Sequence, residues 1–291
     1  MPISERVSRL RDESLGVVPS ISTERARLMT EFYKKDFGLV STAMQRAMAF
    51  AYFIENRTIC INPDELIVGE KGPSPKAAPT FPELCCHSLE DLDILDSREK
   101  IPFAVSPEAR AVYKEEIIPF WKGRSMRDLI FKEMSAEWLD AYNAGIFTEF
   151  MEQRAPGHTV LDDKIYHKGF LDFKADIQRS LDNLDYVSDP HAYAKGEELK
   201  AMLVCADALI RFGERHAEAA EALLEKETDP QRREELERIA QVCRHVPANP
   251  PRDFWEALQY YWFVHLGVTT ELNTWDAFDP GRLDQHLYPF Y

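Results

Sequence analysis

The sequence predicts a mainly α-helical globular protein with a few short β-strands. Apolar residues recur at helical spacing along most of the 291 residues, and most strongly from residue 190 to the end. Hydrophobic residues make up 45% of the chain and aromatic residues 11%, which is enough for a sizeable core and excludes a disordered chain. Residues 71–82 contain four prolines and a glycine, so this stretch is expected to be a loop or connector.

The N-terminal third predicts two helices and a hairpin. A helix N-cap pattern starts at Ser22 and precedes an apolar face, and a second helix is expected over residues 42–56. Two β-branched runs, 58–61 and 65–70, flank the Asn-Pro-Asp sequence 62–64, a combination typical of a hairpin turn.

The rest of the chain predicts short helices followed by long ones. Residues 145–170 are mixed, because glycine and proline interrupt them. The third long helix has a dense aromatic face and is expected to be buried. The expected helices cover residues 106–120, 125–130, 135–144, 196–226, a stretch that starts at Asp229, and a stretch from Asp253 to about Gly267.

The charge and hydropathy exclude several classes of partner. The net charge of -15 argues against nucleic acid, since phosphate contacts require clustered Lys and Arg. No apolar run approaches the ~20 residues that span a bilayer, so no membrane partner is expected. The N-terminus lacks the apolar region of a secretory signal, and the protein is therefore expected to be cytoplasmic.

The cysteines predict neither a disulfide framework nor a metal site. Their number is odd, their spacing is irregular, and no C-x-x-C motif occurs. The five are Cys60, Cys85, Cys86, Cys205 and Cys243.

Residues 147–160 form the first candidate site. A Pro-Gly pair, 156–157, ends the preceding element and presents His158 on a turn, where an imidazole can exchange a proton near neutral pH. From the residues alone, a histidine that caps a local backbone carbonyl is the better interpretation.

The C-terminal stretch, residues 267–291, forms the second candidate site. Polar side chains including Asn273 and Asp276 stand beside aromatic residues on an irregular segment after an apolar helix, which suits a pocket wall. An ordered turn whose Asn and Asp side chains bind backbone amides explains the pattern equally well.

These two patches together resemble the N-terminal part of the glycyl-radical enzymes of the pyruvate formate-lyase superfamily. The resemblance rests on the P-G-H-T loop at 156–159 and the P-G-R-x-D-Q…P-F-Y segment at 280–291, and it extends over residues 3–291. Within the superfamily, three stretches are most similar to the trans-4-hydroxy-L-proline dehydratase branch. They are residues 81–87, 148–159 and 269–278.

The resemblance implies a fold and a chemistry for the complete family chain. Residues 1–291 are expected to form the N-terminal part of a pyruvate formate-lyase domain, whose fold is a ten-stranded α/β barrel wrapped by helices. The thiyl cysteine, its neighbouring glutamate and the radical glycine belong to a C-terminal part that these residues do not include. A radical S-adenosylmethionine activating enzyme installs the glycyl radical there, so no cofactor is expected to bind this part directly.

The resemblance also implies roles for individual residues. His158 is expected to protonate the leaving hydroxyl, Asp276 to bind the hydroxyl or the ring ammonium of a hydroxyproline-like substrate, and Phe150 to pack on its ring. Cys85 and Cys86 are interpreted as structural. Without the C-terminal part the chain is expected to be inactive, and the complete enzyme is expected to be a homodimer.

Two alternatives remain open at this point. The chain could belong to another glycyl-radical lyase that cleaves a C–O, C–N or C–S bond, in a diol, choline or isethionate. It could also be a non-catalytic helical relic or a binding module.

Overall fold

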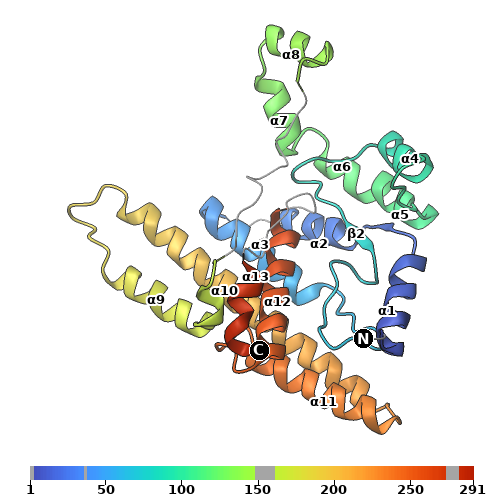
Figure 1. Ribbon diagram of the computed structural model, residues 1–291. Helices are drawn as coiled ribbons and strands as arrows, with labels where there is room; N and C mark the ends of the chain where they lie inside the picture. The colour runs from blue at the N-terminus through green and yellow to red at the C-terminus, as the bar shows by residue number, and fades with distance from the viewer. Residues whose placement is uncertain (1–2, 36–37, 148–160, 273–281) are drawn as a thin grey trace.

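The computed structural model describes residues 3–35, 38–147, 161–272 and 282–291 (Figure 1). Most of these residues are helical, as the sequence predicts, and the described part of the chain contains two three-residue strands. The helices are α1 (Glu5–Gly16), α2 (Glu24–Tyr33), α3 (Thr42–Asn56), α4 (Leu89–Ser97), α5 (Pro107–Val112), α6 (Ile118–Trp121), α7 (Met126–Glu133), α8 (Ala136–Asn143), α9 (Phe170–Asp182), α10 (Ala192–Leu224), α11 (Pro230–His245), α12 (Phe254–Leu272) and α13 (Leu283–Leu287). A π-helical turn (Tyr113–Ile117) and two 3₁₀ turns (Lys164–Tyr166 and Tyr288–Phe290) complete them.

The two strands lie side by side near the N-terminus. Strand β1 (Ser20–Ser22) pairs in parallel with β2 (Ala77–Pro79), with Ser20 opposite Ala77. Strand β2 lies inside the proline-rich stretch that was expected to be a loop. A three-residue strand at the edge of a two-stranded sheet tolerates Pro79, because the missing N–H removes no central hydrogen bond.

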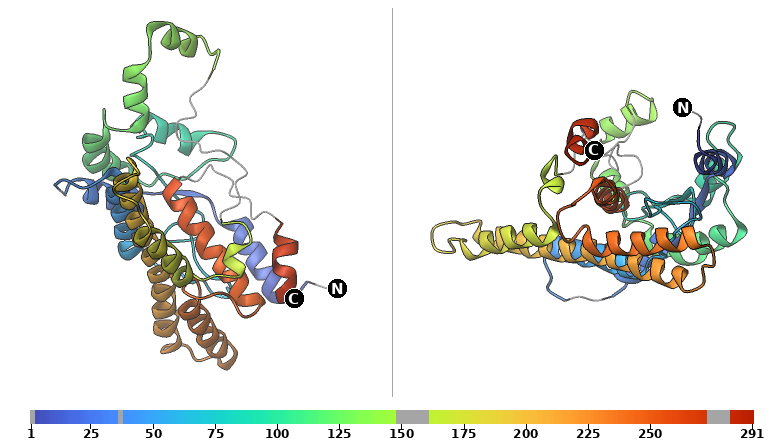
Figure 2. Two further views of the ribbon diagram at one scale, coloured as in Figure 1. Left: turned by 90° about the vertical axis from the view of Figure 1, so that its left-hand side faces the viewer. Right: turned by 60° about the horizontal axis from the view of Figure 1, so that its bottom comes forward.

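Long helices form one layer of the molecule. Helix α10 packs against α3, α9 and α11, and the right-hand view of Figure 2 shows α9, α10 and α11 as a flat layer with α12 beside it, seen nearly end-on. Phe212 of α10 and Phe263 of α12 are fully buried and meet with ring centroids 5.4 Å apart. Burying aromatic side chains of this size contributes about 2–3 kcal/mol each.

Helix α12 lies against the loop segment 66–69 of the N-terminal third. Three of its side chains, at successive turns, bind the backbone of that segment. Trp255 Nε1 donates to the carbonyl of Leu66 at 2.8 Å, and Trp262 Nε1 donates to that of Gly69 at 2.8 Å. Between them, Gln259 accepts from the N–H and donates to the C=O of Val68, both at 2.8 Å.

The hairpin expected over 58–70 is therefore wrong, since the structure has no strand in that range. A buried backbone needs partners for its N–H and C=O groups, and here side chains of a helix supply them in place of a neighbouring strand.

Helix α12 also extends one turn beyond the end expected at Gly267. Threonines at its C-terminal end donate hydroxyl hydrogen bonds back into the helix: Thr269 Oγ1 to the carbonyl of His265 at 2.9 Å, and Thr270 Oγ1 to that of Leu266 at 2.7 Å. Both threonines are 1% exposed. These bonds satisfy the two hydroxyls inside the protein, so Thr269 and Thr270 continue the helix.

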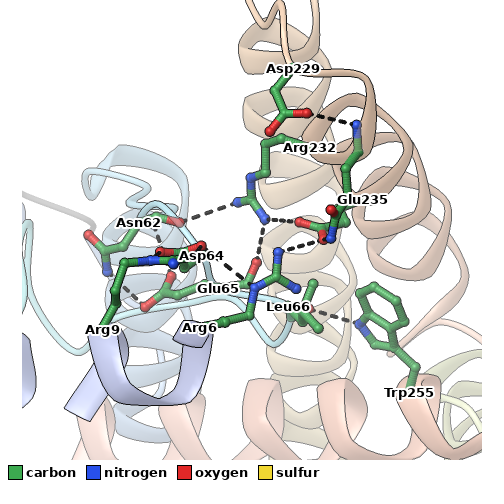
Figure 3. Close-up of polar contacts among 11 residues, drawn as sticks. Arg6, Arg9, Asn62, Asp64, Glu65, Leu66, Asp229, Arg232, Glu235 and Trp255 are labelled. Atoms are coloured by element: carbon green, nitrogen blue, oxygen red, sulfur yellow. Dashed lines mark hydrogen bonds and ion pairs between the residues drawn. The ribbon is translucent and has the colours of Figure 1, made fainter. Parts of the chain in front are cut away.

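Helix α1 was not expected, because it buries no side chain. Charged contacts attach it to the body of the protein (Figure 3). Arg9 makes a bidentate pair with Asp64, with both N···O distances 2.7 Å, and Arg6 donates to Glu235 of α11 at 2.5 Å. Arg232 of α11 donates to the backbone carbonyl of Glu65 at 2.8 Å, so the same network joins α11 to the residue directly before the loop segment 66–69.

None of the helices in the described ranges is both long and apolar enough to cross a membrane.

The start of α9 provides a test of the packing. A methyl group on buried Gly169 would lie 2.2 Å from the carbonyl oxygen of Ala248, where backbone must move. Gly169→Ala is therefore expected to cost about 3 kcal/mol or more. Thermal unfolding followed by circular dichroism should show a lower midpoint, by about 5 °C or more. Gly16→Ala is the matched control, since nothing lies within 4 Å of the added methyl. An equal midpoint for the two variants would contradict this packing.

Candidate functional site

The three candidate site residues lie outside the described residues. His158 and Phe150 fall in 148–160, and Asp276 falls in 273–281. The structure therefore does not test their roles. It does describe the elements on either side of both segments, and these elements define the candidate site.

The first segment begins on an arm that projects from the body. Helices α7 and α8 form this arm (Figures 1 and 2). Phe147, the last described residue before the segment, packs on Trp138 and Tyr142 of α8, with ring centroids 5.1 and 6.0 Å apart. Tyr142 in turn packs edge-on against Phe131 of α7 at 5.0 Å. An aromatic cluster thus fixes the chain where it enters residues 148–160.

The residues that follow the two segments contact each other. Leu161 and Asp162, directly after the first segment, both have left-handed backbones, with φ of 61° and 49°. That conformation costs about 1–2 kcal/mol for a residue with a side chain, so surrounding contacts must hold it. Oδ1 of Asp162 lies 3.6 Å from Nε2 of His286 on α13, which follows the second segment. The ring of Tyr166 packs against the same histidine, with ring centroids 5.4 Å apart and the ring planes tilted by 45°.

Near the last described turn of α12, Arg25 joins its own helix α2 to two other parts of the chain, namely α12 and residues 80–83. Its Nε donates to the carbonyl of Thr270 at 2.7 Å, and its Nη1 donates to the carbonyl of Thr80 at 3.2 Å. Its Nη2 donates to the carboxylate of Glu83. The guanidinium stacks on the ring of Phe81 at 3.9 Å from the centroid, and the whole side chain is 2% exposed.

A second ion pair lies beside the first. Arg46 of α3 binds the carboxylate of Glu271, which follows Thr270 on α12. Burial raises the pKa of Glu271, while Arg46 and Arg25 oppose this effect. Burial and the nearby charges of Glu83 and Glu271 raise the pKa of Tyr33 to about 12, so its hydroxyl stays protonated. Two arginines therefore face two carboxylates at the end of α12.

Four residues of these two ion pairs were not predicted as site residues from the sequence: Arg25, Arg46, Glu83 and Glu271. The acidic partners, Glu83 and Glu271, lie in two of the stretches that carry the family resemblance, 81–87 and 269–278. The resemblance therefore indicated the regions of the chain in which these carboxylates lie. The arginines come from helices α2 and α3, for which no candidate site residue was predicted. A signal for Arg25 was present, because it lies at helical spacing with the buried residues Met29 and Phe32.

Other titratable groups in the core are structural. His216 is buried on α10, where its Nδ1 lies 2.8 Å from the carbonyl oxygen of Phe212. Burial lowers the pKa of His216 to about 3, so the ring is neutral at physiological pH. It packs against Phe212 and Phe263 and serves the core.

None of the five cysteines, all among the described residues, forms a disulfide, and each is at least partly buried. Burial raises the pKa of Cys86 to about 12 and that of Cys205 to about 11. Burial also raises the pKa of Cys243, which is 2% exposed. These thiols remain protonated near neutral pH, which agrees with a structural role. Among the residues described, no three His, Cys, Asp or Glu side chains come together in a way that could hold a metal ion.

Comparison with known proteins assigns the family. The model of the family described as pyruvate formate lyase-like matches residues 2–291. The chain belongs to this family. The match covers both segments of the candidate site as well as the elements that flank them.

Individual members of the pyruvate formate lyase-like family share different degrees of identity with the chain. It is 57% identical over 287 residues to trans-4-hydroxy-L-proline dehydratase of Clostridioides difficile, which covers 99% of this chain and 36% of that protein. It is 33% identical over 297 residues to isethionate sulfite-lyase of Nitratidesulfovibrio vulgaris, again covering 99% of this chain and 36% of the relative.

A solved structure shares the fold. The crystal structure of hydroxyproline dehydratase from Clostridioides difficile with trans-4-hydroxy-L-proline bound matches this chain with a TM-score of 0.95 at 56% identity. The match covers 100% of this chain and 37% of that one. The chain thus spans just over a third of the length of these relatives.

The cysteine environment leads to a test. At a pKa of about 12, roughly one Cys86 side chain in ten thousand is a thiolate at pH 8, whereas about a quarter would be in an unfolded chain. Iodoacetamide should therefore alkylate Cys86 at least about 100-fold more slowly in the folded protein than in urea, as followed by peptide mass spectrometry. Comparable rates in the two conditions would contradict a buried, structural Cys86.

Proposed function

We propose that the chain is the N-terminal part of a glycyl-radical dehydratase that removes water from trans-4-hydroxy-L-proline or a close analogue. The difference in identity carries this proposal: 57% to the hydroxyproline dehydratase against 33% to the isethionate lyase, over nearly the same residues. The fold match to a hydroxyproline dehydratase that holds its substrate supports the same choice.

In this proposal, His158 acts on the leaving group. A hydroxyl leaves far more easily as water, so a general acid beside it accelerates the C–O cleavage by about 10²–10⁴. Asp276 binds the substrate hydroxyl or the ring ammonium through a charge-assisted hydrogen bond. Phe150 packs on the ring and excludes water from the radical intermediate. The contact of Asp162 with His286 supports a shared site, because it brings together the residues that follow the two segments.

The remaining parts of the chemistry belong to the C-terminal part of the family chain. In the proposal that part carries the thiyl cysteine and a glycyl radical, which supplies hydrogen abstraction from the substrate after installation by a radical S-adenosylmethionine activating enzyme. Residues 1–291 then form one portion of a pyruvate formate-lyase domain whose ten-stranded barrel is completed by the C-terminal part. The complete enzyme is proposed to be a cytoplasmic homodimer, and residues 1–291 alone are proposed to be inactive.

The substrate is tested with the chain as part of a complete glycyl-radical enzyme, activated without oxygen. We expect loss of water from trans-4-hydroxy-L-proline, with kcat/KM at least about 100-fold above that for glycerol, choline or isethionate, because none of the three has a ring for the proposed site to bind. Electron paramagnetic resonance measures the glycyl radical in each preparation. A full radical signal without turnover of hydroxyproline would reject this substrate.

The role of His158 has its own test. His158→Ala is expected to lower kcat by about 10²–10⁴ at an unchanged radical content, because the general acid is lost. His167→Ala is the matched control: its side chain is 69% exposed, and its nearest acidic group is Asp163 at 4.0 Å. Its kcat should remain that of the unmodified enzyme. Equal kcat values for the two variants would contradict acid catalysis by His158.

A further inference from the structure

The arm formed by α7 and α8 is poorly covered by the described residues. Each of its two helices has eight residues, and none of their side chains is buried. Isolated helices shorter than about 12–15 residues are marginal in water, and most helices in proteins are stabilised by packing an apolar face. Only the base of the arm is tied to residues 83–84, where the N–H groups of Met126 and Arg127 donate to backbone carbonyls at 2.9 and 3.0 Å. Beyond this base the arm projects from the body (Figures 1 and 2).

Helix α7 has two apolar faces. One face holds Phe131, whose ring packs edge-on against Tyr142 of α8 with centroids 5.0 Å apart. The other face carries Met126, Leu129 and Ile130, at the i, i+3 and i+4 spacing that normally marks a buried stripe. Met126 and Leu129 are instead 38% and 52% exposed. The second face is therefore apolar and open.

This open face forms one wall of a groove that runs along α7 to the start of α8. The groove has a volume of about 610 Å³. Trp138 of α8 lies at its far end, where the side chain is 60% exposed and packs against Phe147 with ring centroids 5.1 Å apart. A tryptophan beside an apolar groove is the type of anchor that dominates the binding energy of protein interfaces. The groove is lined by Leu129, Ile130, Glu133, Met134, Ser135 and Trp138.

The length of the relatives indicates what covers this groove. The hydroxyproline dehydratase of known structure contains the fold of this chain with a TM-score of 0.95, and the match covers 37% of that chain. More than half of that protein therefore consists of further residues. In a complete chain of this kind, these residues are tethered to the arm, and tethering gives them a high effective concentration at its surface.

A second copy of the chain fits the groove less well because of charge. The chain has a net charge of -15. Glu133 lines the groove, and the exposed Glu137 lies beside Trp138 in the sequence. Like charges that meet across an interface are unfavourable and suppress association. The length of the relatives and the charge of the chain thus favour the same occupant.

We propose that the groove along α7 and α8 is the docking site for an apolar segment of the C-terminal part of the complete family chain. This inference rests on the proposed function in one respect, because it takes residues 1–291 as the N-terminal part of a longer chain. The docked segment buries Leu129 and Trp138 and supplies the packing that two eight-residue helices lack.

Site-specific photocrosslinking in the complete enzyme tests this docking. The photoreactive residue p-benzoylphenylalanine replaces Trp138, whose aromatic character it keeps. The matched control places it at Asp140, which is exposed and lies about 160° farther around α8, away from the groove. We expect crosslinks from position 138 to apolar peptides of the C-terminal part, as mapped by mass spectrometry. Their yield should exceed that from position 140 by about 10-fold or more, because only groups in contact react.

A second probe covers a failure of the Trp138 variant to fold. Photo-methionine at Met134 is nearly isosteric with the natural residue and should crosslink to the same peptides. Crosslinks to a second copy of the chain, crosslinks confined to residues 1–291, or equal yields from positions 138 and 140 would each overturn the proposal.

The crosslinks do not depend on the reaction that the enzyme catalyses. Turnover of hydroxyproline, measured on the same preparation, reports on the substrate alone. Crosslinks to the C-terminal part without turnover would reject the proposed substrate and support the docking site. Turnover without these crosslinks would reject the docking site and support the substrate.

Discussion

The loop segment 66–69 has no strand partner in the described part of the chain, and this constraint determines how the N-terminal third meets the C-terminal third. Its buried N–H and C=O groups each cost about 1–3 kcal/mol if left without partners. Side chains of α12 supply four hydrogen bonds, all at 2.8 Å, through Trp255, Gln259 and Trp262. These four bonds fix the rotation of α12 and its position along its axis relative to residues 66–69. Arg25 then binds α12 at the carbonyl of Thr270.

Several elements could be predicted from local sequence because local interactions determine them. Helix α3 has the predicted bounds, and Ser41 caps it by accepting a hydrogen bond from the N–H of Met44 at 3.2 Å. Asp229 caps α11 in the same way, followed by a proline in the first turn. These signals need no knowledge of the rest of the fold.

Other features depend on partners distant in sequence and could not be predicted. The β-branched residues of 58–70 fit a strand, but the decisive hydrogen-bond partners lie nearly 200 residues away on α12. Helix α1 buries nothing and is held by ion pairs to Asp64 and Glu235. Arg25 shows only as a charged residue on an apolar helix face. His158, Phe150 and Asp276 came from the family resemblance, and their roles remain predictions because they lie outside the described residues.

We propose that His158 and Asp276 contribute to one substrate-binding wall, next to the described elements α8, α12 and α13. A crystal structure of the complete enzyme with trans-4-hydroxy-L-proline bound tests it most directly. The account predicts that His158 and Asp276 both lie within hydrogen-bond distance of the substrate, while Arg25 still binds the carbonyl of Thr270. A substrate bound elsewhere, or one that contacts neither side chain, would contradict it.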